Sequence, residues 1–132
     1  MNNFFKKIFN TAPKTIPESV QKFLTDRFPN AINIEWEYKD GLFESIFYLN
    51  EIEHIAKISE VKGIIEYKIN LNLTELPQQI LSSEDIHGEI MNTIAIHREN
   101  ELLYEIIVRD KKLNRTLLLL NSSGDLLNWK KI

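Results

Sequence analysis

The chain repeats its own pattern after about 60 residues, and this repetition limits its fold more than any other feature. Three pairs of similar short segments carry the repeat: Ile16-Pro17 and Leu76-Pro77, Phe43-Glu44 and Tyr104-Glu105, and the single residues Gly63 and Gly124. The spacing stays constant across a helix signal, a strand and a turn, which is typical of a duplicated supersecondary unit. The sequence therefore predicts two copies of one helix-and-strand motif.

The first copy opens with signals for a helix. Thr15 and Glu18 have the spacing of a capping box, and Pro17 fits the first helical turn, where a missing N–H costs little. Apolar residues at helical spacing continue as far as Phe28, and the following Pro29 disfavours a further helical residue. We therefore expect a helix of about three turns that ends at Phe28.

Four strands are expected after this helix. Asp40-Gly41 is typical of a type I′ turn and predicts a hairpin between the first two strands. In the first strand, alternation places Ile32, Ile34, Trp36 and Tyr38 on one face and Asn33, Glu35 and Glu37 on the other. The strands of this copy are expected at residues 32–38, 42–49, 52–59 and 64–71.

The second copy predicts a shorter helix around Leu76, Ile80 and Leu81, followed by four more strands. These strands are expected near residues 90–97, 102–109, 113–121 and 125–131. Residues 70–74 are too few for a flexible linker, so we expect one domain, residues 15–132, made of the repeats 15–72 and 73–132. The predicted fold class is α+β: two helix-plus-four-strand meanders that form one eight-stranded antiparallel sheet with the helices on one face.

Residues 1–14 form a separate N-terminal segment with an amphipathic pattern. Its apolar residues recur at the spacing of one face of a short helix, with two lysines beside them: Phe4, Phe5, Ile8, Phe9 and Ala12, with Lys6 and Lys7. The alternatives are a helix that docks on the protein's own body or frays, and a helix that binds a membrane surface or a partner. We favour the first, because the segment is short and has only two basic residues within its apolar pattern.

Composition excludes several classes of protein. The chain has 132 residues, no cysteine and a formal net charge of −3. The lack of cysteine excludes disulfides, thiolate metal sites and thiol nucleophiles. Lysines and glutamates alternate along the chain, without the basic patch that is typical of nucleic-acid-binding proteins. We therefore expect no nucleic-acid partner.

The apolar runs of the sequence are short. None approaches the roughly 20 residues of a membrane-spanning helix, so no membrane span is predicted. Residues 1–9 lack the continuous apolar stretch of a secretory signal. As written, the sequence indicates a cytoplasmic protein, and the alternative is a periplasmic or secreted protein whose leader has been removed.

Candidate catalytic and metal-binding residues form no known pattern. His54, His87 and His97 lack the spacing of metal ligands. Glu35 and Glu37 share one face of a strand, which could supply a carboxylate pair, although such alternation is more typical of a solvated polar face. We therefore predict no catalytic, cofactor-binding or metal-binding residues, no cofactor and no enzymatic activity.

Several strands are apolar on both faces. A sheet covered by helices on one side only should be polar on the other, so the additional apolar side chains pack against something else or await a partner. The N-terminal segment, a second copy of the chain and a foreign protein are the alternatives. Because aromatic residues commonly anchor protein interfaces, the predicted partner-binding residues are aromatic: Phe43, Phe47, Tyr48, Tyr67 and Tyr104.

The residues from Thr15 to about Lys131 also resemble a known family. The segments that carry the resemblance are Ile16-Pro17, Phe28-Pro29-Asn30-Ala31, Glu35-Trp36-Glu37, Gly41-Leu42-Phe43-Glu44, Leu76-Pro77, Tyr104-Glu105 and Gly124-Asp125-Leu126-Leu127. Together they are similar to the PepSY-like proteins with the beta-lactamase-inhibitory-protein-like fold. The resemblance implies a tandem helix-plus-four-strand repeat whose sheet face binds another protein, with no catalytic residues. The second repeat departs from the pattern, with Ile86-His87-Gly88 at its helix exit and no counterpart of Trp36, so the two halves are not expected to bind alike.

These observations predict a non-enzymatic module that binds a protein or peptide through the open face of its sheet, with a homodimer as an alternative state. The alternative function is a small-molecule carrier or enzyme with a cavity between sheet and helices, where Glu35, Glu37 or His54 would be the polar group. The side chain of Trp36 lies either on the sheet face that meets the first helix or on the open face. We expect it on the helix side, in the core, because the first helix needs an apolar surface beneath it.

Overall fold

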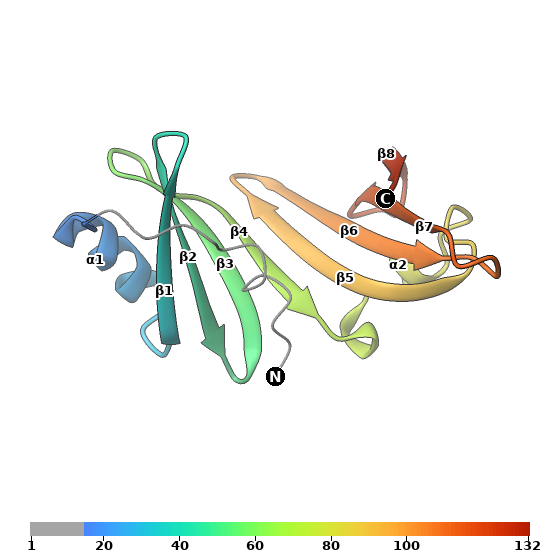
Figure 1. Ribbon diagram of the computed structural model, residues 1–132, viewed down its shortest axis with the longest axis horizontal. Coiled ribbons are helices and arrows are strands. Elements are labelled where there is room, and N and C mark those ends of the chain that lie inside the picture. Colours follow the sequence, from blue (N-terminus) through green and yellow to red (C-terminus); the bar gives the residue numbers. More distant parts are fainter. Residues whose placement is uncertain (1–14) are drawn as a thin grey trace. The chain divides into compact units, whose positions relative to one another are not determined.

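The computed structural model describes residues 15–132, which form an antiparallel sheet with few helices (Figure 1). The eight strands follow one another in the sheet in the same order as in the sequence. The chain divides into two compact units, the first ending at Ile69 and the second comprising Asn70–Ile132. The predicted α+β fold class with one eight-stranded antiparallel sheet is therefore confirmed. The predicted N-terminal amphipathic segment, residues 1–14, lies outside the described residues.

The first unit contains one helix and the first four strands, in the order predicted. Their bounds are α1 (Glu18–Arg27), β1 (Ile32–Lys39), β2 (Leu42–Leu49), β3 (Ile52–Ser59) and β4 (Gly63–Leu71), of which the last crosses the unit boundary. The second unit contains two short helical segments and four strands. Their bounds are η2 (Leu73–Glu75), α2 (Gln78–Leu81), β5 (Glu89–Arg98), β6 (Glu101–Arg109), β7 (Arg115–Asn121) and β8 (Leu126–Lys131).

Helix α1 begins later than its sequence signals predict. Pro17 is the N-cap residue, with an extended ψ of 144°, and no side chain caps the helix. Glu18 is consequently the first helical residue and lies too early to complete a capping box with Thr15, so that prediction is wrong. The end of the helix is as expected, because the Phe28 N–H donates to the Leu24 carbonyl oxygen over 2.8 Å and Pro29 follows.

The hairpin between β1 and β2 has the predicted turn, whereas β1 has an irregularity that the sequence did not predict. Asp40 and Gly41 have φ values of 53° and 77°, as a type I′ turn requires at both central positions. At the start of β1, Asn33 has a φ of 54° and the register shifts. Ile32 pairs with Tyr48, whose side chain lies on the opposite face from that of Trp36. The expectation that Ile32 and Trp36 share a face is therefore wrong.

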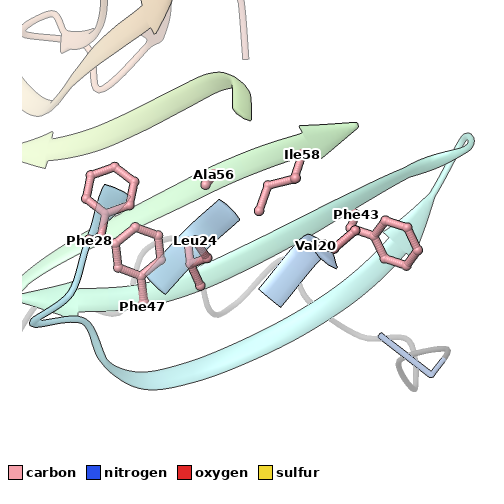
Figure 2. Close-up of a cluster of buried hydrophobic side chains, with 7 residues drawn as sticks. All are labelled: Val20, Leu24, Phe28, Phe43, Phe47, Ala56 and Ile58. Atoms are coloured by element: carbon pink, nitrogen blue, oxygen red, sulfur yellow. The ribbon is translucent and has the colours of Figure 1, made fainter. Parts of the chain in front are cut away.

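The core of the first unit lies between α1 and one face of its strands. Its buried residues are Val20, Leu24 and Phe28 at α1, Phe43 and Phe47 of β2, and Ala56 and Ile58 of β3 (Figure 2). The rings of Phe28 and Phe47 are 4.9 Å apart in a tilted arrangement, which is favourable for aromatic pairs. Trp36 is partly buried and packs against this cluster, so its predicted place in the core is confirmed.

In the second unit, two short helical segments stand where the first unit has one longer helix. Asn72 and Glu75 form a capping box around η2. In α2, Ile80 is fully buried, and the helix approaches the turn between β7 and β8, where the Ser83 hydroxyl donates to the Gly124 carbonyl oxygen over 3.1 Å. A Cβ atom at Gly124 would lie 2.4 Å from the Gln79 carbonyl oxygen, so this contact requires glycine.

Candidate binding surface of the first unit

The strand register of the first unit shows which side chains lie opposite α1. Ile46 of β2 lies between Glu35 of β1 and Ile55 of β3, and it alternates with the core residue Phe47. Residues that lie directly opposite each other share a face, and successive residues point to opposite faces. The face without α1, which we call the distal face, therefore carries Glu35, Glu37, Glu44, Ile46, Tyr48, Glu53, Ile55, Lys57, Glu66 and Lys68.

The centre of the distal face is apolar and buried. Ile46, Tyr48 and Ile55 have exposed fractions of only 1%, 2% and 9%. Among residues 15–69 the first unit has a single helix, and that helix packs against the opposite face. A sheet face without a covering layer normally meets water with polar side chains. These three side chains instead have the burial of a protein core.

A buried hydrogen bond joins two neighbouring strands at this centre. The Tyr48 hydroxyl donates to Glu53 Oε2 over 3.1 Å, and Glu53 is fully buried. Burial, followed by the hydrogen bond to Glu53 and the negative charges of Glu53 and Glu35, raises the pKa of Tyr48 to about 12. The neutral, hydrogen-bonded form of Tyr48 is therefore the form that the folded chain stabilises.

Charged side chains surround the apolar centre. Lys57 Nζ lies 4.0 Å from Glu44 Oε1 and 3.7 Å from Glu66 Oε2, so one ammonium group is shared by two carboxylates. Further glutamates, Glu35 and Glu37, lie on the edge strand β1. The distal face thus carries more carboxylates than ammonium groups and favours a positively charged occupant.

The predicted partner-binding residues of the first unit lie on two different faces. Phe43 and Phe47 are buried beneath α1. Tyr67 packs against the same cluster, with its ring 5.4 Å from that of Phe28 and its hydroxyl 3.4 Å from Arg27 Nη2. Tyr48 is the only one of these four aromatic residues on the distal face.

Sequence reasoning did not select the residues that surround Tyr48, although one signal for them was available. The alternation in β2 places Ile46 with Tyr48, and that in β3 places Glu53 with Ile55. What the sequence lacked was the register that joins these pairs, which alone shows that they form one patch.

The second unit also has buried apolar residues on both faces of its strands. Tyr104 pairs with Ala95 and Leu120, and all three are buried. Burial raises the pKa of Tyr104. On the alternate face, Leu103 pairs with Ile96, and both are buried as well. Tyr104 is therefore a packed residue within its own unit.

His54 lies on the opposite face of the sheet from the two glutamates considered with it for chemistry. His54 is buried on the α1 side, where it stacks on Phe47 with ring centroids 5.4 Å apart, and its Nδ1 lies 2.9 Å from the Ile52 carbonyl oxygen. Glu35 and Glu37 lie on the distal face instead. Within residues 15–132, no group of three His, Cys, Asp or Glu side chains is placed to hold a metal ion. In the same range, no helix has the length and apolar character needed to span a membrane.

Comparisons with known proteins identify the fold. No protein-family model matches the chain, and no curated protein matches it in sequence. A DUF2874 family protein from Bacteroides uniformis is similar in structure, with a TM-score of 0.80 and 15% identity over 89% of this chain and 90% of that chain. A candidate periplasmic protein from Bacteroides eggerthii has a TM-score of 0.80 and 19% identity over 90% and 91% of the two chains.

A BLIP-like protein from Bacteroides fragilis has a TM-score of 0.75 and 18% identity over 96% of this chain and 92% of that chain. Identities this low establish similarity of fold and nothing finer. The fold implied by the sequence resemblance is confirmed, while membership of the PepSY-like proteins stays a prediction. The chain has the fold of the BLIP-like and DUF2874 proteins.

Proposed function

We propose that the chain is a non-enzymatic module that binds a protein or peptide segment on the distal face of its first unit. The observation that carries this proposal is the apolar centre of Ile46, Tyr48 and Ile55 on a face where residues 15–69 provide no covering helix. Apolar patches rimmed by polar residues are typical of protein interaction sites. The similarity of fold to a BLIP-like protein supports binding over catalysis.

The chemistry of the distal face defines the segment that it would take. Ile46 and Ile55 favour apolar side chains at the centre of the contact. The surrounding glutamates, including Glu35 and Glu44, favour lysine or arginine at its margins. We therefore propose a partner segment with an apolar middle and basic flanks.

The cellular location of this binding is also a proposal. The fold of the chain is similar to that of a candidate periplasmic protein from Bacteroides eggerthii, which favours the periplasmic alternative over the cytoplasmic one. A binding module without metal or cofactor chemistry would work in either compartment. Fractionation of cells that express the full-length protein, followed by immunoblotting, tests the periplasmic proposal. Recovery with the cytoplasmic fraction would contradict it.

Two short synthetic peptides with the same apolar residues test the binding proposal, one flanked by lysines and the other by glutamates. By isothermal titration calorimetry, we expect the lysine-flanked peptide to bind the intact chain and the glutamate-flanked peptide to bind at least about tenfold more weakly. Added salt should weaken the tighter interaction, because the charges at the margin are screened. Equal binding of the two peptides would refute the proposed chemistry.

A matched pair of charge reversals locates the interaction. Glu35→Lys changes an exposed residue of the distal face, whereas Glu60→Lys makes the same change in the exposed turn between β3 and β4. We expect Glu35→Lys to raise the dissociation constant of the lysine-flanked peptide about fivefold and Glu60→Lys to leave it nearly unchanged. Equal effects of the two substitutions would place the binding elsewhere.

A further inference from the structure

The apolar centre of the distal face is already buried in a single chain. Ile46 and Tyr48 are almost inaccessible, and α1 packs against the other face. A partner protein is therefore not needed to explain this burial. The chain also has residues 1–14, which lead directly into Thr15 and α1 and lie outside the described part of the structure.

The sequence of this segment complements the distal face in both size and charge. Its apolar residues match the centre of the face, and its lysines match the surrounding carboxylates: Phe4, Phe5, Ile8 and Phe9, with Lys6, Lys7 and Lys14. Fourteen residues span roughly 46 Å when extended and about 21 Å as a helix. Neighbouring strands are only about 4.8 Å apart, so the segment can reach from the start of α1 past the edge strand β1 to Ile46.

We propose that residues 4–12 of this same chain occupy the distal face in the free protein, and that a binding partner must displace them. This inference rests on the proposed function in assigning the same face to the partner. It adds that, in the absence of a partner, the distal face is occupied by a segment of the same chain. The N-terminal segment is then an internal competitor that sets the threshold for binding.

Physical linkage determines how such a competitor would act. A tethered segment experiences an effective concentration in the millimolar range, so even weak intrinsic affinity keeps it bound. The apparent affinity of an external peptide is lowered by the fraction of chains in which the face is vacant. Substitutions that weaken the segment should consequently strengthen external binding.

The absence of cysteine from the chain allows a direct test in the full-length protein. A nitroxide attached to Asn10→Cys should broaden the methyl signals of Ile46 and Ile55 more strongly than those of Val20 and Leu24, which lie on the α1 side. Equal broadening of both sets, or stronger broadening of Val20 and Leu24, would overturn the proposal.

Charge reversal in the segment provides the matched comparison. In the spin-labelled chain, Lys6→Glu combined with Lys7→Glu should remove the preferential broadening, whereas Lys130→Glu combined with Lys131→Glu in β8 should retain it. If both double variants retain it, the charge complementarity is wrong and the proposal fails.

The experiment is repeated with a mixture of spin-labelled chains and isotope-labelled chains without the nitroxide. Broadening in this mixture would show that a second copy covers the face, which also overturns the proposal.

Peptide binding separates this inference from the proposed function. The variant with Lys6→Glu and Lys7→Glu should bind the lysine-flanked peptide about fivefold more tightly than the unmodified chain. Preferential broadening without peptide binding to either form would support the internal contact and refute the proposed function. If instead the peptide binds both forms equally and no preferential broadening is seen, the proposed function is supported and the internal contact is refuted.

Discussion

At the scale of single residues, Tyr48 and Glu53 make the contact most sensitive to chemical change. Tyr48→Phe preserves the buried ring but removes the hydroxyl that donates to the Glu53 carboxylate. Because a buried acceptor then loses a donor, the free energy of unfolding at pH 7 should fall by about 1–3 kcal/mol. Urea denaturation measures this change, and an unchanged midpoint would show that water or another group replaces the hydroxyl.

The raised pKa of Tyr48 also predicts how stability depends on pH. In the unfolded chain a tyrosine loses its proton near pH 10, whereas burial, together with the hydrogen bond to Glu53 and the nearby negative charges, holds the folded-state pKa of Tyr48 at about 12. The stability that this raised pKa contributes is fully present below pH 10 and is lost as the pH rises to about 12, because in this range the unfolded state binds fewer protons than the folded state. Across this range, stability should fall more steeply for the unmodified chain than for Tyr48→Phe. Parallel curves would contradict the assigned environment.

The two tryptophans provide a matched pair for the core of the first unit. Trp36 packs against the cluster beneath α1, whereas the Trp129 residue is 56% exposed. Trp36→Ala should lower the free energy of unfolding by about 3 kcal/mol, the lower end for such truncations because the side chain is only partly buried. Trp129→Ala should change it by less than about 0.5 kcal/mol. Comparable urea midpoints for the two variants would contradict the core assignment.

At the scale of secondary-structure elements, two glycines separate backbone strain from close packing. Gly124 has a φ of 93° and abuts the Gln79 carbonyl oxygen, whereas Gly41 has a φ of 77° with no atom within 4 Å of its Cβ position. Gly41→Ala should cost about 1 kcal/mol for the left-handed conformation alone. Gly124→Ala should cost at least about 1 kcal/mol more, because α2 must also move. Thermal unfolding of both variants measures the difference, and equal losses would argue against the close approach of α2.

The elements that sequence predicted best depend on local chemistry. Asp40-Gly41 predicted its turn because an Asp-Gly pair readily adopts the two successive positive φ values that a type I′ turn requires. The capping box predicted at Thr15 and Glu18 does not form, because packing, and not a local motif, determines where the helix begins. Asn72 and Glu75 have the same type of spacing and do form a capping box, which the sequence analysis did not predict. The bulge at Asn33 changes the face of Ile32, and regular alternation gives no sign of it.

The candidate site depends on information that only the folded structure contains. Tyr48 was predicted as a partner-binding residue, but Phe43 and Phe47 were predicted with it because all three are aromatic residues in one strand. The distal face exists because cross-strand register places Ile46 beside Ile55 and Tyr48 beside Glu53. Register is set by the turns and by burial together, so a list of residue types could not identify this patch.

At the scale of the whole molecule, the order of the strands has a consequence for how the chain folds. Every strand lies next to its neighbour in sequence, so no pairing has to wait for a distant part of the chain. Closing a short loop costs little entropy, and folds built from such contacts cross their barriers quickly. Stopped-flow refolding should therefore be faster than is typical of β-sandwiches. A dominant phase lasting seconds would contradict this expectation, whereas a minor slow phase is expected from proline isomerisation. During synthesis, the first hairpins could form while the ribosome is still adding the later strands.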